Sequence, residues 1–203
     1  MIIAEDIIQG TPEWLQAKLG VPSASNFDRL LTSKGAISKS REGYLNELIA
    51  ERITGQSTYH RITDEMAEGT RREHESRQFF ELIHGVEIKQ VGMIYPDEEK
   101  RYLVSPDGLE KRFGLELKNP LAKTVVEYKR SSVFPNKYIL QVQGSLLVSG
   151  FDYWWFMAYH SPELFFEIKV YRDEELIKKL KEALDAFCLE LAIATKKLKE
   201  LGG

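Results

Sequence analysis

The sequence is poor in cysteine and shows no internal repeat or low-complexity run. Among its 203 residues there is a single cysteine, Cys188. One cysteine excludes an internal disulfide, a multi-cysteine zinc site and a four-cysteine iron–sulfur cluster. Cys188 lies in an apolar stretch with helical spacing, where we expect a buried small side chain rather than a reactive thiol.

Long apolar runs and net positive charge are also missing. No run reaches the roughly 18 apolar residues that cross a bilayer, and the first residues lack the basic and apolar regions of a signal peptide. We therefore expect a cytoplasmic protein without membrane contact. The formal net charge of −3 gives no overall attraction to nucleic acid. An acidic total is still compatible with a local basic surface and with a carboxylate-rich metal site.

What is present is the composition of an ordinary folded protein. Hydrophobic residues make up 43% of the chain and charged residues 29%, which does not favour disorder. The length suits one domain with a sizeable core. We therefore expect a single domain over residues 1–203.

Capping and turn signals predict a helical N-terminal region. Thr11 followed by Pro12 is typical of a helix start, and serines at 23–25 cap a second, short helix. Serines at such a position also suit a phosphate, because the first amides of a helix are exposed. Asp64 is the expected cap of a long helix. The predicted helices begin near Thr11, Ser23, Tyr44 and Asp64 and end near Gly20, Leu31, Gly55 and Gly85.

The pattern changes to period two after Gly85. Strands are expected at 86–91, 101–105 and 113–118, linked by short turns as an antiparallel meander. Two helices follow, at about 121–130 and 137–148, then strands at 153–159 and 164–171, whose aromatic residues we assign to the core. A long amphipathic helix over 173–200 ends the chain. This order predicts an α/β fold with a central mixed sheet flanked by helices.

One pair of segments carries the candidate chemistry. Ser105-Pro106-Asp107-Gly108 ends one predicted strand, and Gly114-Leu115-Glu116-Leu117-Lys118 forms the next. Side chains alternate across a strand, so Glu116 and Lys118 share one face while the leucines point to the other. If the strands are neighbours, Asp107 meets this face. Two carboxylates beside a lysine form a site for a hard divalent cation.

Such a site suits phosphodiester hydrolysis. Mg²⁺ prefers oxygen ligands and retains waters, and two metals about 3.5–4 Å apart clamp the attacking water and the leaving oxygen. Asp107 would bridge, with Glu116 and the carbonyl of Leu117 completing the shell. Lys118 would orient the water or neutralise charge in the transition state. Its role as a general base stays open, because carboxylates raise the pKa of a lysine and cations lower it.

The alternative is an acidic hairpin with a surface ion pair. An Asp followed nine residues later by Glu-x-Lys is a weak pattern alone. Glu73 in the preceding helix and the amide-bearing helix with Gln141 strengthen the metal-site interpretation. His74, next to Glu73, is expected on the helix surface, because neighbouring helix positions point about 100° apart.

Together these residues resemble a known family. The segments 105–109 and 114–118 resemble the active site of the phage lambda exonuclease family, the YqaJ-like viral recombinases, within the PD-(D/E)xK nuclease superfamily. The resemblance continues through 14–25, 69–80 and 138–146 in the same order. It therefore covers most of the chain.

The resemblance implies a restriction-endonuclease-like core and a metal-dependent 5′-to-3′ exonuclease. Such an enzyme acts on linear double-stranded DNA ends, releases 5′-mononucleotides and leaves a 3′ single strand for recombination by annealing. It implies two Mg²⁺ per site, with Mn²⁺ as a substitute. It further implies a ring-shaped homotrimer, a single-strand annealing protein as partner, and the cytoplasm of a bacterial or phage-infected host cell.

The resemblance also assigns roles to residues, with helices in 11–55 contributing to a DNA-end pocket. Where the family has an arginine two residues before Gly20, this chain has Lys18, which lacks the planar bidentate fork. The implied metal ligands are Asp107, Glu116, Leu117 and Glu73; the catalytic lysine is Lys118, supported by Gln141; the pocket for the 5′-phosphate contains Lys18, Ser25 and Ser105.

Basic residues elsewhere are candidates for DNA phosphate contacts. A site- or structure-specific endonuclease of the same superfamily remains an alternative, although no base-reading element is evident. A non-catalytic DNA-binding assembly module is a second alternative, but it would usually lack a metal carboxylate or the lysine. The basic candidates are Lys39, Arg41, Lys123, Lys129, Arg130 and Lys137.

Overall fold

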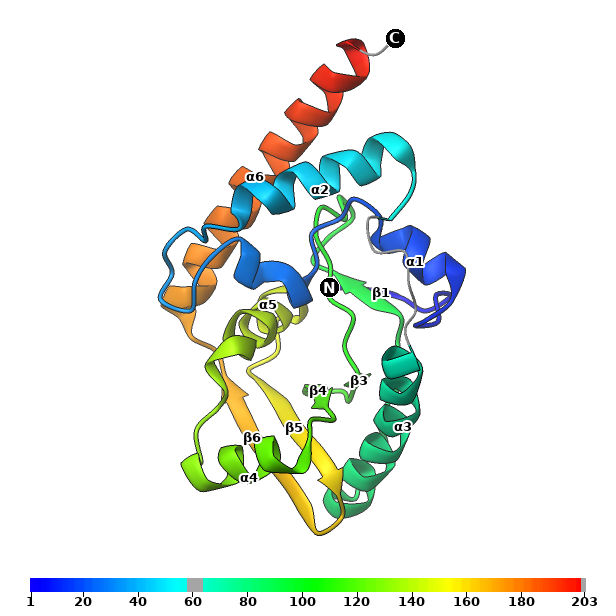
Figure 1. Cartoon of the computed structure of the whole chain (residues 1–203), viewed down its shortest axis with the longest axis vertical. Helices are drawn as coiled ribbons and strands as arrows, with labels where there is room; N and C mark the ends of the chain where they lie inside the picture. Colours follow the sequence, from blue (N-terminus) through cyan, green and yellow to red (C-terminus); the bar gives the residue numbers. More distant parts are fainter. Residues whose placement is uncertain (58–63, 202–203) are drawn as a thin grey trace.

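The protein is described here from a computed structural model. It covers the backbone of residues 1–57 and 64–201, and the side chains of the same ranges apart from 64–71. A four-stranded sheet occupies one half of the molecule and most of the helices the other (Figure 1). The predicted α/β fold, a mixed central sheet flanked by helices, is confirmed.

The N-terminal helices follow their sequence signals. Helix α1, Pro12–Lys18, is capped by Thr11, whose hydroxyl accepts from the backbone N–H of Trp14 at 3.3 Å. The predicted second helix is the 3₁₀ helix η1, Ala24–Arg29, and the Ser23 side chain accepts no capping hydrogen bond from it. The long helices are α2, Arg41–Thr54, and α3, Asp64–His84. The predicted cap at Asp64 lies outside the described side chains.

The central sheet has the order β3-β4-β5-β6. Its strands are β3, Gly108–Leu109; β4, Gly114–Lys118; β5, Tyr153–Ser161; and β6, Leu164–Tyr171. The β4–β5 pair is parallel, whereas the outer pairs are antiparallel. The parallel pair requires a crossover, which consists of α4, Ala122–Ser131; η2, Asn136–Tyr138; and α5, Ile139–Ser149.

The predicted meander was wrong both in its strand lengths and in its pairing, because 101–105 does not pair with β4. Residues 86–91 contribute one isolated antiparallel bridge, between Lys89 and Leu109, and residues 101–105 contribute single bridges only. The strand in this region is β2, Met93–Tyr95, paired with β1, Ile2–Ala4, as a separate two-stranded sheet. The cause is burial: successive side chains from 102 to 104 are all enclosed, so this segment does not alternate between a core face and solvent.

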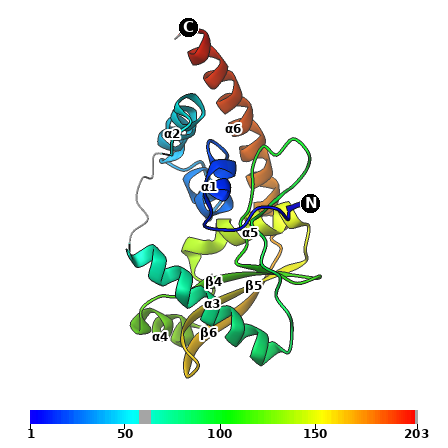
Figure 2. The same cartoon turned by 90° about the vertical axis from the view of Figure 1, so that its right-hand side faces the viewer.

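Apolar clusters bind helices to both faces of the sheet. Phe80 of α3 packs with Leu115 and Leu117 of β4, and Val125 of α4 packs with Phe156 of β5 on the other face. The sheet, α3 and α4 form the lower half, with α1 and α2 above (Figure 2). Trp154 and Phe156 are completely buried, which confirms the core assignment of these aromatic residues.

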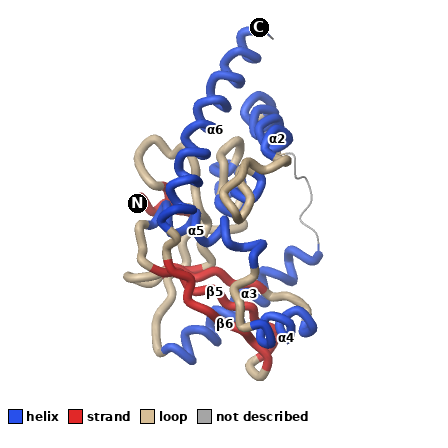
Figure 3. The backbone as a smooth tube through the Cα atoms, turned by 90° about the vertical axis from the view of Figure 1, so that its left-hand side faces the viewer, coloured by secondary structure: helices blue, strands red, loops and turns tan. Residues whose placement is uncertain are grey.

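Helix α6, Glu174–Leu201, extends beyond the rest of the molecule at its C-terminal end (Figure 3). It packs against α5 and α2. Cys188 on this helix is buried, as predicted, and burial raises the pKa of its thiol to about 11. Across the described ranges, every helix is too short or too polar to cross a membrane.

Candidate active site

The central strand brings the predicted residues together. In the β4–β5 register Glu116 lies beside Phe156 and Lys118 beside Ala158. Asp107, just before β3, is tied back to β4: its N–H donates to the carbonyl of Leu115 at 3.1 Å, and the N–H of Leu117 donates to its Oδ2 at 2.6 Å. The predicted convergence of an aspartate, a glutamate and a lysine is therefore present.

Glu116 contacts two of the other predicted site residues, Lys118 and Gln141. Its side chain is 2% exposed, and its Oε1 lies 2.5 Å from Nζ of Lys118. Gln141, near the start of α5, donates to the same oxygen at 2.6 Å. The resemblance implied that Gln141 supports Lys118. In the structure Gln141 donates to Glu116, so it acts on the lysine through this carboxylate.

Burial sets the protonation of these groups. It raises the pKa of Glu116 to about 7, with the Asp107 charge adding to the effect and Lys118 opposing it. Burial raises the pKa of Asp107 as well. Burial alone would lower the pKa of Lys118, but Glu116 and Asp107 outweigh it and raise this pKa above its ordinary value. In this arrangement Lys118 is an ammonium ion, which suits charge stabilisation better than proton abstraction.

Helix α3 contributes Glu73 to the site, and Arg77 of the same helix connects Glu73 to Asp107. Nη2 of Arg77 lies 2.5 Å from Oε1 of Glu73, and its Nε donates to the backbone carbonyl of Asp107 at 2.9 Å. Burial raises the pKa of Glu73 to about 7, and the charge on Asp107 adds to the rise. Sequence reasoning missed Arg77, although its position four residues after Glu73, on the same helix face, was a usable signal. His74 is exposed, as predicted.

These groups fit a hard divalent cation in donor type, because carboxylate and carbonyl oxygens are the ligands that Mg²⁺ prefers. The mutual elevation of pKa between Glu73, Asp107 and Glu116 shows that negative charge gathers here. A closed metal cage is not formed: within the described side chains, no three His, Cys, Asp or Glu cluster tightly enough to hold an ion. Instead Glu116 faces Lys118, and Glu73 faces Arg77.

Two of the residues predicted to bind a 5′-phosphate, Lys18 and Ser105, share Trp14 as a neighbour beside this site. Nζ of Lys18, at the end of α1, lies 4.0 Å from the ring centroid of Trp14. The indole N–H of Trp14 donates to Oγ of Ser105 at 3.1 Å and to the carbonyl of Gly92 at 3.0 Å. Burial lowers the pKa of Lys18 to about 8, against the opposing charge of Asp107. Trp14 thus joins Lys18 to Ser105, a link that the sequence did not reveal.

The start of η1 lies against the same segment. Ser23 forms a parallel bridge with Leu103, and the N–H of Ala24 donates to the carbonyl of Leu103 at 3.0 Å. Oγ of Ser25 lies 3.1 Å from Oγ of Ser23. This pairing sets the serine-rich start of η1 alongside the residues that lead to Ser105. We refer to Lys18, Ser25 and Ser105 as the phosphate pocket.

The other predicted DNA contacts lie outside these clusters. Arg41 at the start of α2 pairs with Glu190 of α6 at 2.7 Å, and its guanidinium lies 5.2 Å from the ring of Phe187. Lys39 is exposed in the preceding loop. Their contact with DNA stays a prediction, as it does for the exposed residues Lys123, Lys129, Arg130 and Lys137.

Tyr138 is a further residue that the sequence did not single out for the site. Its ring lies 5.3 Å from Nζ of Lys118 and 4.8 Å from Nζ of Lys137. An ammonium ion is attracted to the face of an aromatic ring at such distances. Tyr138 therefore flanks Lys118 and links it to Lys137, one of the exposed lysines.

The mixed sheet and its Asp–Glu–Lys site have the arrangement that the sequence predicted for a nuclease. The family model of the YqaJ-like viral recombinase domain matches residues 13–152, and the chain belongs to this family. No curated protein sequence matches it. Among solved structures it is similar to an alkaline exonuclease, LHK-Exo, from Laribacter hongkongensis, with 28% identity and a TM-score of 0.84 over 95% of this chain and 98% of that one.

Two other structures extend the comparison. LHK-Exo in complex with dAMP gives a TM-score of 0.83 at 28% identity, again over 95% and 98% of the two chains. A phage-related exonuclease from Haemophilus somnus 129PT gives 0.62 at 13% identity over 89% and 96%, which shows the shared fold alone. The predicted family and the predicted DNA exonuclease class are confirmed by the family match and the LHK-Exo relationship.

Proposed function

We propose that this chain is a metal-dependent exonuclease of the PD-(D/E)xK superfamily. It hydrolyses one strand of linear duplex DNA from the 5′ end, releases 5′-mononucleotides and leaves a 3′ strand for recombination. The observation that carries the proposal is the spacing of Ser105 and Asp107. Two extended residues span at most about 7 Å, so a terminal phosphate at Ser105 leaves the first phosphodiester near Asp107.

Each side chain has a definite task in this scheme. The Lys118 ammonium neutralises charge that develops on the phosphoryl oxygens. Gln141 holds Glu116 in orientation, and Arg77 fixes Glu73 and the Asp107 backbone. Asp107, Glu116, Glu73 and the Leu117 carbonyl would hold Mg²⁺, with Mn²⁺ as a substitute. When bound, the metal supplies an activated water and polarises the phosphate.

The proposed metal requirement and polarity can be tested together. EDTA is expected to stop digestion of a blunt linear duplex, and Mg²⁺ or Mn²⁺ is expected to restore it. With Mg²⁺, a label on the first 5′ nucleotide should appear in the mononucleotide fraction at once, whereas a 3′-terminal label on the same strand should appear last. Undiminished activity in EDTA, or early release of the 3′ label, would contradict the proposal.

The preference for a 5′-phosphate should depend on pH through Lys18. Its lowered pKa of about 8 means that the ammonium is present below pH 8 and is lost as the pH rises above it. A terminal phosphate is a dianion above its second pKa of about 6. The ratio of kcat/KM for 5′-phosphoryl over 5′-hydroxyl duplex should therefore be full at pH 7 and fall between pH 8 and 9.5, because kcat/KM reports groups of the free enzyme.

Lys18→Arg is the matched control, because arginine keeps its charge across this range. Its preference for the 5′-phosphate should stay constant from pH 7 to 9.5. A wild-type ratio that is equally constant would exclude Lys18 as the titrating group.

The remaining expectations rest on the family resemblance and are proposed on that basis. They comprise a homotrimeric ring, a single-strand annealing protein as partner, and action in the cytoplasm of a bacterial or phage-infected cell. Exposed Leu189 and Ile193 lie one turn apart on α6, which is compatible with a contact to another subunit.

A further inference from the structure

Two side chains of α2 form hydrogen bonds with the turn between α1 and η1, which separates Lys18 from Ser25. Gly20 lies between Lys18 at the end of α1 and Ser25 in η1. Its N–H donates to Oε2 of Glu51 at 2.8 Å, and its carbonyl accepts from Nε of Arg52 at 2.7 Å. Two successive side chains of one helix thus hold both polar backbone groups of a single residue. We refer to Glu51, Arg52 and Gly20 as the turn clamp.

The conformation of Gly20 makes this close approach possible. Its φ of +66° lies in the left-handed region, where a residue with a side chain is strained. A Cβ at this position would lie 2.4 Å from Cγ of Arg52. The backbone therefore approaches the arginine stem more closely than any other residue type would permit. Glycine at position 20 is therefore required for the contact between this turn and α2.

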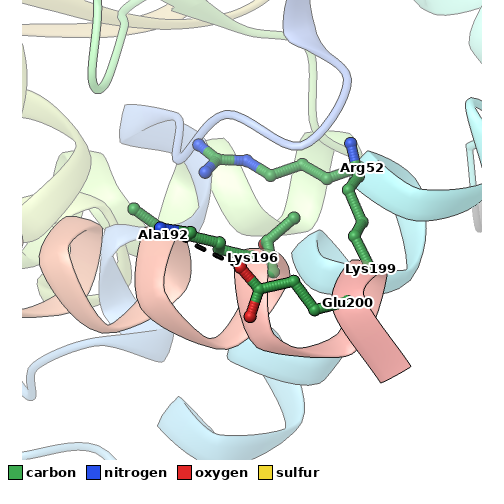
Figure 4. Close-up of a pocket in the computed structure, with 6 residues that line it drawn as sticks. Arg52, Ala192, Lys196, Lys199 and Glu200 are labelled. Atoms are coloured by element: carbon green, nitrogen blue, oxygen red, sulfur yellow. Dashed lines mark ion pairs between the residues drawn. The ribbon is translucent and has the colours of Figure 1, made fainter. Parts of the chain in front are cut away.

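The two halves of the clamp differ in their surroundings. Glu51 is 6% exposed, and a buried carboxylate needs donors such as the Gly20 amide. Arg52 instead borders a cavity of about 460 Å³ between α2 and α6. Figure 4 shows its side chain reaching along one side of this cavity. The remaining lining residues come from α6: Ala192, Thr195, Lys196, Lys199 and Glu200.

Arg52 is therefore open to substitution without loss of core packing. Its side chain faces the cavity on one side and the turn on the other, and the residue is only partly buried. A change that removes the hydrogen bond to Gly20 while keeping the length of the stem should leave the fold intact. The function of this hydrogen bond can then be measured apart from overall stability.

We propose that Glu51 and Arg52 are positioning residues that set the preference of the enzyme for a 5′-phosphorylated DNA end. The inference rests on the phosphate pocket of the proposed function. Lys18 presents a point charge on a flexible stem, without the rigid fork of an arginine. Its alignment with Ser25 and Ser105 therefore depends on the backbone between them, and the clamp fixes that backbone at Gly20.

The test compares Arg52→Met with wild type on duplexes that differ only at the 5′ end. For the 5′-phosphoryl duplex, kcat/KM should fall about tenfold, mainly through KM, because the turn loses a hydrogen bond and Lys18 is no longer held in position. The rate on the 5′-hydroxyl duplex should not change. Affinity for the 5′-phosphoryl duplex in EDTA, measured by anisotropy, should fall by the same factor.

Two variants complete the design. Arg172→Met is the control, because Arg172 likewise donates to a backbone carbonyl, that of Leu146 at 2.7 Å, at a remote position; this change also removes the ion pair of Arg172 with Glu174. It should retain the full 5′-phosphate preference. Glu51→Gln keeps an acceptor for the Gly20 amide and should retain most of the preference, whereas Glu51→Ala should lose it.

The possible outcomes distinguish the role of the turn clamp from the phosphate pocket and from the exonuclease activity itself. If the wild type strongly prefers a 5′-phosphate and Arg52→Met keeps this preference, the proposed role of the turn clamp is overturned. The exonuclease proposal is not affected by that result. Equal loss of activity on both duplexes, parallel to a lower melting temperature, also overturns the clamp, because it indicates a purely structural role. A wild-type enzyme that cuts both duplexes equally overturns the phosphate pocket itself, and the clamp with it.

Discussion

Replacing Asp107 or Lys118 with alanine is expected to reduce digestion of linear duplex DNA by about a hundred- to a thousandfold, the loss typical of removing a group that stabilises charge in a transition state. The carboxylate of Asp107 accepts a hydrogen bond from the N–H of Leu117 at 2.6 Å, and its backbone carbonyl accepts one from Arg77. Lys118 supplies the ammonium beside Glu116. The measurement is release of acid-soluble nucleotides from linear duplex in Mg²⁺.

Structural damage can be separated from chemical loss. Asp107→Asn keeps an acceptor for the Leu117 amide while removing the charge, and should be as inactive as Asp107→Ala with a near-native melting temperature. Lys181→Ala, an exposed lysine on α6 paired with Asp185, should have full activity. Digestion at the wild-type rate by either Asp107 variant or by Lys118→Ala would exclude the assigned site.

Gly114→Ala is expected to destabilise the protein by about 3 kcal/mol, the upper part of the range for overpacking a core. Gly114 starts β4 opposite Trp154. A Cβ here would lie 2.1 Å from a ring carbon of Trp154, which is completely buried and cannot move aside. Because the same strand carries Glu116 and Lys118, activity should fall together with the free energy of unfolding, measured by urea denaturation.

Gly43→Ala provides the comparison. Gly43 lies in α2, and no atom lies within 4 Å of a Cβ added there. Its replacement should stabilise the helix by up to about 1 kcal/mol. In the Gly114→Ala background, Trp154→Leu should recover part of the lost stability, because it removes the ring that the new methyl group meets. A Gly114→Ala protein as stable as wild type would show that β4 and β5 do not pack as described.

Much of the fold was predictable because its signals are local. The cap at Thr11, the glycines that end α2 and α3, and the strand alternation at Glu116 and Lys118 each depend on neighbours within a few residues. These features fixed the helices and the face of β4 that carries the site. The strand predicted at 101–105 was wrong for the opposite reason, because the pairing of this segment depends on distant residues. It forms one bridge with the start of η1 and one with β2.

The residues missed at the site share a long separation from their partners. Trp14 reaches Ser105 across 91 positions, and Gln9 donates to the carbonyl of Pro106 across 97. Arg77 contacts the backbone of Asp107. No periodicity within one element indicates such contacts. Strand alternation and the resemblance indicated the candidate residues Asp107, Glu116 and Lys118, whereas the contacts of Trp14, Gln9 and Arg77 became visible only in the folded chain.

The central claim is that this chain degrades DNA from an end. The most direct measurement incubates the enzyme with Mg²⁺ and equal amounts of linear duplex carrying 5′-phosphates and covalently closed circular duplex. The account predicts that the linear DNA is converted to 5′-mononucleotides and a 3′ single strand while the closed circles stay intact. Cutting of the closed circles at a comparable rate would contradict it and would favour an endonuclease.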